Sequence, residues 1–144
     1  RFRTAWGELS VVGIADLVNL KRTNRPGDYE VISRLVKLRL SEAAEPGARL
    51  LDWALENCFR GEDALDVAQR YRSLVTPGMV RRHSWLRHAV GTVRPDGVQA
   101  AMDRKLLAAL KSGRDYWSPR ISELRRLKPA GKLIPEGTPV ADLI

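Results

Sequence analysis

Prolines and glycines divide this sequence into short stretches of helical periodicity, and this division restricts the possible folds more than any other feature. Within each stretch, apolar residues recur at offsets of three and four, as in an amphipathic helix. Proline lacks the N–H that a helix interior requires, so helices end before it or restart at it. The predicted helices begin near Ile14, Asp28, Ala48, Glu62, Met79, Asp96 and Ser118. They end near Pro26, Glu45, Cys58, Val75, Val90, Gly113 and Pro129.

Several of these boundaries carry their own local signals. Asp28 is a natural N-cap, and Thr76 followed by Pro77 combines an N-cap with proline at the first helical position. The segment 48–58 has a wide apolar band, which predicts a helix at the centre of the core. Prolines and glycines recur after Lys128, so we expect residues 129–144 to form an extended arm.

A short segment before the first helix favours a β-strand instead. Residues 9–12 form a β-prone run that Gly13 bounds, which predicts a buried strand. A lone strand cannot satisfy its backbone hydrogen-bonding groups. We therefore expect it to pair with residues preceding Arg1, with another chain, or with the tail around 132–134. The predicted fold is mainly α, or α+β if this strand pairs.

The composition is that of a globular protein with one compact core. The chain has 144 residues, of which 44% are hydrophobic and 29% charged. Apolar runs such as Leu106 to Leu110 are far shorter than the roughly 20 residues of a membrane-spanning helix. We divide the chain into a strand-helix-helix segment (1–41), a helical domain (42–128) and the extended tail (129–144).

Cysteine and histidine are too scarce for most metal or disulfide chemistry. Cys58 is the single cysteine, so no intrachain disulfide is possible, and we expect it to be a structural thiol. His83 and His88 lie among arginines, which repel a metal cation, so no metal site is predicted. The chain begins with Arg1 and shows no secretory signal, so we expect a cytoplasmic protein, present here as a fragment or cleavage product.

The basic balance of the chain favours anionic partners. The net charge is +8 and the pI about 10.2, which suits phosphate-bearing ligands, although a basic surface can equally serve solubility. The candidate nucleic-acid-binding residues are Arg81, Arg82, Trp85, Arg87, Arg125 and Arg126. The alternative, which we favour for Trp85, buries this ring in the core and leaves the arginines solvated. Tyr116 and Trp117 are predicted to be packing anchors, with Ile121 and Leu124 inside the last helix.

The turn between the first two helices gathers charge of both signs. Lys21, Arg22, Arg25 and Asp28 surround it, and cations beside a helix N-terminus make a reasonable phosphate site. Asp28 could orient Arg25 by a charge-assisted hydrogen bond. The alternative is structural: Lys21 and Arg22 would be solvated helix-end charges, and Asp28 a plain N-cap.

The run VVGIADLVNLKR (11–22), followed by RPGDY (25–29), resembles the closing segment of small nucleotidyltransferase-fold proteins. These include the toxin-type bacterial nucleotidyltransferases of toxin–antitoxin systems. In those families a strand leads into a helix that ends in a leucine–lysine pair, and an arginine and an aspartate follow in the next turn. The resemblance implies that Lys21 helps neutralise nucleotide phosphates, that Asp28 orders the turn or the lysine, and that Arg25 supports both.

The catalytic signature of that family does not occur in this chain. A nucleotidyltransferase needs a Gly-Ser loop for phosphate and an Asp-x-Asp pair to hold magnesium, and neither is present. We therefore expect no catalysis by this chain alone, and Mg²⁺ with a nucleoside triphosphate only alongside an upstream catalytic core. The predicted function is a basic rim for a nucleotide or RNA site. The alternative is a non-enzymatic helical module that binds nucleic acid or a protein partner. Further possible partners are other copies of this chain, in a homo-oligomer, and a missing sheet-bearing domain.

Overall fold

The computed structural model describes residues 2–4, 7–9 and 11–131, and these are mainly helical, as predicted. The elements in chain order are β1 (Phe2–Thr4), β2 (Gly7–Leu9), α1 (Ile14–Leu20), α2 (Pro26–Ser41), α3 (Ala48–Glu56), α4 (Gly61–Arg70), the 3₁₀ turn η1 (Arg72–Leu74), α5 (Pro77–Arg82), α6 (Leu86–Val90) and α7 (Pro95–Leu127). Most of the predicted arm, residues 132–144, lies outside the described residues.

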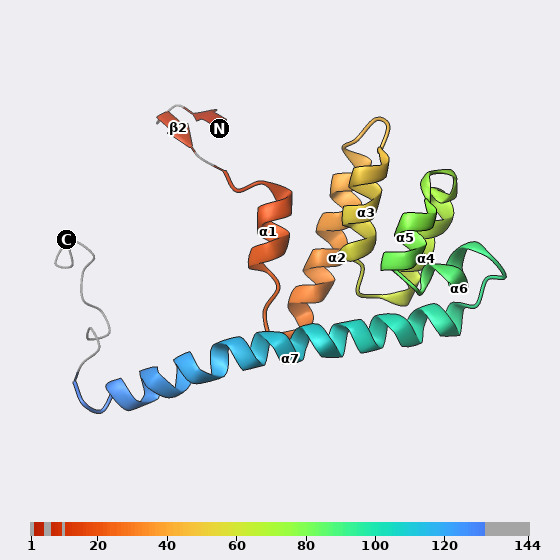
Figure 1. Ribbon diagram of the computed structural model, residues 1–144. Coiled ribbons are helices and arrows are strands. Elements are labelled where there is room, and N and C mark those ends of the chain that lie inside the picture. Colours follow the sequence, from red (N-terminus) through yellow and green to blue (C-terminus); the bar gives the residue numbers. More distant parts are fainter. Residues whose placement is uncertain (1, 5–6, 10, 132–144) are drawn as a thin grey trace.

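The helices form a row that stands on one long helix. Figure 1 shows α1 to α6 on one side of α7, which runs across their ends. Neighbours in the sequence are also neighbours in the row, because α1 contacts α2, α2 contacts α3 and α3 contacts α4. The long helix packs mainly against α4 and α6. Its C-terminal part extends past α1, as Figure 1 also shows.

One continuous hydrophobic cluster joins the row to α7. Leu51 and Leu55 of α3 are fully buried, which confirms that this helix lies at the centre of the core. Val18 of α1 and Val98 and Met102 of α7 belong to the same cluster. Burying a side chain of this size contributes about 1.5–3 kcal/mol, so these contacts hold the two layers together.

Two lysines bridge elements of the fold. The Nζ of Lys37 on α2 lies 2.5 Å from the carboxylate of Asp63, a buried side chain near the start of α4. Lys105 of α7 donates from Nζ to the carbonyl oxygens of Leu55 (3.2 Å) and Glu56 (2.7 Å). These carbonyls belong to the last turn of α3 and lack helical partners, so the lysine caps that helix end.

The predicted strand is placed differently in the structure. Strand β2 pairs antiparallel with β1, with Phe2 opposite Leu9, so the partner that the structure shows lies within this chain. Val11 and Val12 lie beyond the strand and are more than half exposed, so the predicted buried strand over residues 9–12 is wrong. The alternative partner at 132–134 lies outside the described residues.

The predicted helix from Met79 to Val90 is interrupted. The N-cap at its start is confirmed, since the N–H of Met79 donates to Thr76 Oγ1 at 3.2 Å. Helix α5 then ends at Arg82, and α6 begins at Leu86. His83, Trp85 and Leu86, which lie at or next to this break, are all buried.

The predicted helices 62–75 and 96–113 also end at different positions. Helix α4 stops at Arg70, and a separate 3₁₀ turn follows. The predicted end at Gly113 and the predicted start at Ser118 are both wrong, because α7 is continuous from Pro95 to Leu127 and contains Pro119. Gly113 lies within α7, at the point where this helix crosses the backbone of Thr23. A Cβ there would lie 2.9 Å from the carbonyl carbon and oxygen of Thr23, which only glycine permits.

In the described part of the chain, no helix combines the length and the apolar character needed to cross a membrane.

The crossing at Gly113 predicts a specific sensitivity. Gly113→Ala should lower the free energy of unfolding by about 1–3 kcal/mol, because the new Cβ must push α7 away from the backbone of Thr23. Gly27→Ala is the matched control, since no atom lies within 4 Å of a Cβ at that helical position. Urea unfolding followed by circular dichroism measures both. A Gly113→Ala protein as stable as the wild type would show that the crossing tolerates a side chain.

Candidate functional site

The turn between α1 and α2 is closed by hydrogen bonds around Thr23 and Asp28. Thr23 Oγ1 donates to Asp28 Oδ2 at 2.5 Å and accepts from the N–H of Arg25 at 3.1 Å. Lys21 Nζ lies 3.3 Å from Asp28 Oδ1. Asp28 is therefore not the predicted N-cap: Arg25 holds that position, Pro26 opens the helix, and Asp28 lies in its first turn. Its carboxylate holds the turn and Lys21 together.

Electrostatics keep this carboxylate ionised. The hydrogen bond from the Thr23 hydroxyl lowers the pKa of Asp28, and the nearby charges of Lys21 and Arg25 lower it further. These effects outweigh the desolvation that raises it. The side chain of Lys21 stays 40% exposed, so its ammonium is paired with Asp28 but still accessible to solvent.

The turn is also fastened to the core. The hydroxyl of Tyr29 donates to the carbonyl oxygen of Thr23 at 2.9 Å, and its ring packs edge-on against Phe59 at a centroid distance of 4.7 Å. Arg22 donates from Nη2 to Asn57 Oδ1 at 2.8 Å and lies over the ring of Phe59. Arg22 thus acts as a structural link between the end of α1 and the end of α3.

Two shallow hollows lie where this turn meets α7. The first, of about 380 Å³, is lined by Thr23, Asn24, Arg25, Trp117 and Ile121. The second, of about 200 Å³, is lined by Asn24, Arg114, Ser118, Ile121, Ser122 and Arg125. Because both hollows include Asn24 and Ile121, they adjoin, and we call the pair the turn–α7 groove.

The turn–α7 groove has a positive lining. Arg25, Arg114 and Arg125 border it, and no acidic residue is among its lining side chains. In the described residues, none of these three arginines forms an ion pair. Some neighbouring basic groups are already paired, as Arg126 is with Glu123 at 3.9 Å. The structure therefore brings the predicted Arg25 and Arg125 to one groove and leaves Arg126 beside it.

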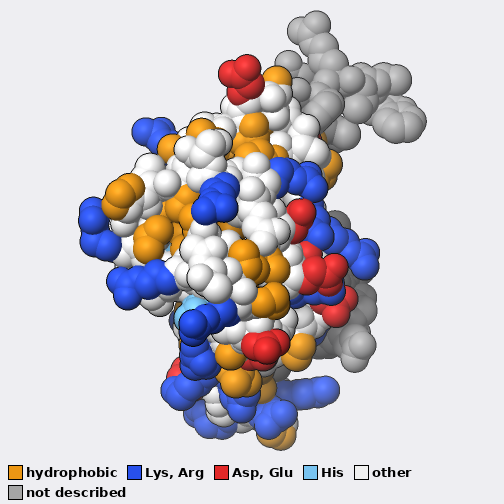
Figure 2. All heavy atoms as spheres, turned by 90° about the vertical axis from the view of Figure 1, so that its right-hand side faces the viewer, with side chains coloured by type: hydrophobic (Ala, Val, Ile, Leu, Met, Phe, Trp, Pro, Cys, Tyr) orange, Lys and Arg blue, Asp and Glu red, His pale blue; other side chains and the backbone are white. Residues whose placement is uncertain are grey.

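The other predicted nucleic-acid face, on α5 and α6, has a different character. Trp85 is only 6% exposed, which confirms the interpretation of this ring as part of the core. Arg82 is paired with Asp52 at 2.7 Å, while Arg81 and Arg87 are exposed. Figure 2 looks onto this end of the molecule and shows Asp and Glu side chains among the Lys and Arg. This face therefore has exposed arginines, but the Trp85 ring is not accessible for stacking on a base.

A buried histidine lies beside that face. His83 Nε2 is 3.1 Å from Asp52 Oδ1, and Nδ1 is 3.7 Å from Glu56 Oε2. Desolvation raises the pKa of Asp52, but the hydrogen bonds from Arg82 and His83 prevail and hold it below its usual value. Of the two carboxylate contacts of His83, only that of Nε2 is within hydrogen-bonding distance, so the contact with Asp52 fixes the orientation of the ring.

Metal and thiol chemistry find no support in the described part of the chain. No group of three or more His, Cys, Asp or Glu side chains that could hold a metal ion occurs there. Cys58 is buried, and this burial raises the pKa of its thiol to about 12. At neutral pH the nucleophilic thiolate is therefore absent, which agrees with a structural thiol.

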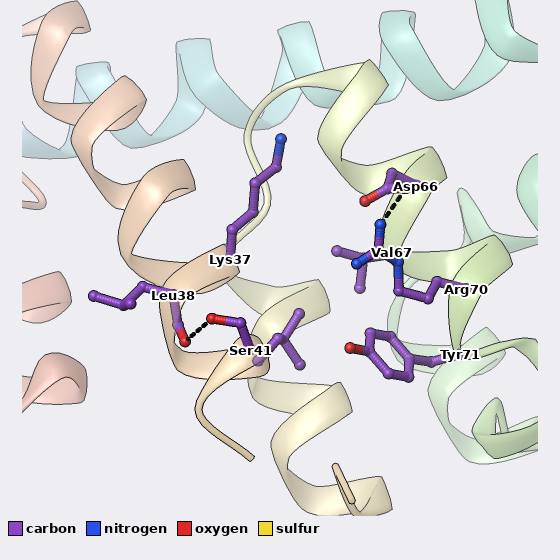
Figure 3. Close-up of a pocket in the computed structure, with 8 residues that line it drawn as sticks. Lys37, Leu38, Ser41, Asp66, Val67, Arg70 and Tyr71 are labelled. Carbon is purple, nitrogen blue, oxygen red and sulfur yellow. Dashed lines mark hydrogen bonds and ion pairs between the residues drawn. The ribbon is translucent and has the colours of Figure 1, made fainter. Parts of the chain in front are cut away.

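A further pocket of about 340 Å³ lies between α2 and α4 (Figure 3). Several of its polar groups are engaged: Ser41 Oγ donates to the Leu38 carbonyl oxygen at 2.8 Å, Arg70 pairs with Asp66 at 3.4 Å, and Lys37 pairs with Asp63 of α4. The pocket thus presents charges of both signs and few free donors. It lacks the convergent, single-sign groups that distinguish the turn–α7 groove.

The sequence alone could not show that the α1–α2 turn and the C-terminal part of α7 lie side by side and form the turn–α7 groove. Arg25 and Arg125 lie near opposite ends of the described chain and meet only because α7 continues past Gly113. Arg114, Asn24 and Trp117 were not predicted to belong to the site. The signal that could have found them is the apolar spacing of Trp117, Ile121 and Leu124, which continues the helical period across the predicted break.

Comparison with protein-family models, with curated proteins and with solved structures found no match to this chain.

The closed turn predicts a pH-dependent contribution to stability. Because the pKa of Asp28 is lowered in the folded state, its ionised form stabilises the fold above the ordinary carboxyl pKa of about 3.9. That stabilisation disappears as the pH falls through the lowered value. Asp28→Asn should therefore be less stable than the wild type at pH 7, with the difference shrinking below about pH 4.

Thermal unfolding across this pH range measures the effect. Glu30→Gln is the matched control, since Glu30 is an exposed acid on the same helix and makes no ion pair within the described residues. A constant difference between Asp28→Asn and the wild type from pH 7 to pH 2 would contradict the assigned role of the carboxylate.

Proposed function

We propose that this chain is the helical part of a nucleotidyltransferase-like protein and that its turn–α7 groove binds the phosphates of an RNA or nucleotide. The observation that carries the proposal is the meeting of Arg25, Arg114 and Arg125 around two adjoining hollows with no acidic lining residue. Arginine is well suited to this task, because its planar guanidinium donates two parallel hydrogen bonds to a phosphate. Three such groups in one groove favour a ligand with several phosphates.

The fixed geometry of the turn supports the same role. Thr23, Asp28 and Tyr29 hold the backbone next to Arg25, so this cation is attached to an ordered turn. An ordered site loses less conformational entropy when it binds a ligand. Lys21 adds a partly exposed ammonium with three donors, of which Asp28 occupies one. Lys21 is not among the residues that line the turn–α7 groove. We assign it to the phosphate site from the resemblance, with Asp28 as the residue that orients it.

The enzymatic half of the proposal rests on the resemblance of residues 11–29 to the nucleotidyltransferase families. Catalysis would need a Gly-Ser loop and an Asp-x-Asp pair from sequence other than these 144 residues. Magnesium and a nucleoside triphosphate would bind to those groups, and this chain would contribute the basic rim. The alternative is a non-enzymatic module that uses the same groove to bind nucleic acid.

The gene sequence before the codon for Arg1 distinguishes these alternatives. We expect it to encode a Gly-Ser dipeptide followed by an Asp-x-Asp pair in the same reading frame. If no such motifs precede Arg1, the enzymatic half of the proposal fails, whereas phosphate binding by the groove is decided separately.

Replacing the arginines tests the groove directly. Arg25→Ala together with Arg125→Ala should weaken binding of a fluorescein-labelled oligoadenylate by roughly tenfold or more, because each charge-assisted hydrogen bond contributes about 1.5–3 kcal/mol. Fluorescence anisotropy at several salt concentrations measures the affinity. The variant should also have a shallower salt dependence, by about 0.7 in logarithmic slope for each phosphate of the single strand that it no longer neutralises.

The matched control removes the same charge from the other basic face. Arg81→Ala together with Arg87→Ala leaves the groove unchanged, so its affinity should stay close to that of the wild type. If this control loses as much affinity as the groove variant, net charge explains the binding. If the wild type fails to bind the oligonucleotide even at low salt, the proposed function is wrong.

A further inference from the structure

The C-terminal part of α7 carries large apolar side chains that the other described residues leave exposed. Tyr116, Trp117, Ile121 and Leu124 are between 39% and 55% exposed. The predictions that Tyr116 and Trp117 are packing anchors, and that Ile121 and Leu124 lie inside, are therefore wrong. The reason is that α7 extends past α1, beyond the row of helices that covers its first half (Figure 1). Exposed apolar groups gathered in this way mark an interaction surface.

Trp117 lies within the groove that holds the arginines. It lines the first hollow together with Arg25 and Ile121, one turn of helix away. An accessible indole ring and an exposed guanidinium thus border the same space. Asn24, shared by both hollows, adds an amide that can both donate and accept hydrogen bonds.

Among the described tryptophans, Trp117 is the most exposed. Trp53 also lines hollows together with arginines, but its side chain is partly buried. Trp85 is buried in the core, and Tyr29 and Phe59 pack against each other. The adjacent Tyr116 is more exposed than Trp117, but the guanidinium of Arg120 lies 3.7 Å from the centroid of its ring. Arg120 also donates to the Tyr116 carbonyl oxygen, which holds it in place. One face of Tyr116 is therefore occupied by a cation of its own helix.

We propose that Trp117 stacks on an unpaired base of a single-stranded RNA or nucleotide whose phosphates are held by Arg25, Arg114 and Arg125. This inference rests on the proposed function and deepens it by naming the base-binding residue and the class of nucleic acid. Basic grooves with aromatic platforms bind single strands, since every base offers a flat face to an aromatic ring. In a duplex the bases are stacked on one another, so the indole cannot reach them.

The charge of the groove argues against two other occupants. A second copy of this chain would bring the same excess of positive charge, +8 per chain, and the same arginines to the interface. A basic or neutral apolar helix could cover Trp117 and Ile121 but would leave three arginines without counter-charges. A strand of nucleic acid supplies both components, with a base for the indole and phosphates for the guanidinium groups.

Substitution of the indole tests the inference. Trp117→Leu should weaken binding of a short single-stranded oligoadenylate by about tenfold, which is within the range for removal of one base–aromatic stack. Trp117→Phe should recover most of that affinity, because it restores an aromatic face. The same RNA in a duplex should bind more weakly to the wild type and should be insensitive to Trp117→Leu.

Tyr116 packs edge-on against Trp117 at a centroid distance of 5.2 Å, so it is unsuitable as a control. The matched control is Leu107→Ala, which removes another exposed apolar side chain of α7 that does not line the groove and should leave affinity unchanged. Because Trp117 and Leu107 are both exposed, circular dichroism should show that all variants keep the wild-type helical content and unfolding midpoint. If Trp117→Leu binds like the wild type while the Arg25 and Arg125 double variant is impaired, the stacking inference is wrong and the proposed function stands. If the wild type does not bind the oligoadenylate at all, the proposed function and the stacking inference are both wrong.

Light scattering decides the remaining outcome. The wild type should have the same mass as Trp117→Leu across a range of protein concentrations. The contrary outcome is that the wild type self-associates, and that Trp117→Leu abolishes this association without changing the RNA affinity. It would show that copies of this chain cover the exposed face. That result would overturn the stacking inference.

Discussion

The close crossing of α7 over the α1–α2 turn is the interaction on which the candidate site depends. At Gly113 the helix comes so near to the carbonyl group of Thr23 that no side chain fits between them. This crossing places the C-terminal half of α7 next to Arg25, where it forms the second wall of the turn–α7 groove. A larger residue at position 113 would separate the two walls, and with them the arginines.

The distribution of charge gives that groove its chemical character. Several cations are engaged in structural tasks: Lys37 neutralises the buried Asp63, Lys105 caps α3, and Arg82 binds Asp52. In the described residues, Arg25 and Arg125 have no such partner, so their positive field is available where the turn meets α7. The groove therefore combines a positive lining with an exposed indole, and this combination is the basis of the proposed binding of a nucleic-acid strand.

The helical content and several helix boundaries could be predicted from sequence, whereas the exposure of the Trp117 side chain could not. Trp85 and Trp117 both lie beside arginines and apolar residues, and the local pattern does not distinguish them. Trp85 is buried at the break between α5 and α6. Trp117 is exposed because no helix of the row lies above that part of α7 (Figure 1). Burial depends on what packs against a helix face, and the residues that pack there are distant in sequence.

The sequence by itself determined the mainly helical fold, the N-cap at Thr76 and the clustering of Lys21, Arg25 and Asp28 at one turn. Each of these depends on interactions among residues a few positions apart, which a local pattern records. Only the tertiary structure decided that α7 runs uninterrupted through Gly113 and Pro119. Local rules assign glycine to helix ends and proline to helix starts, but the close approach to Thr23 explains the glycine. The turn–α7 groove exists because that long-range approach outweighs the local signals.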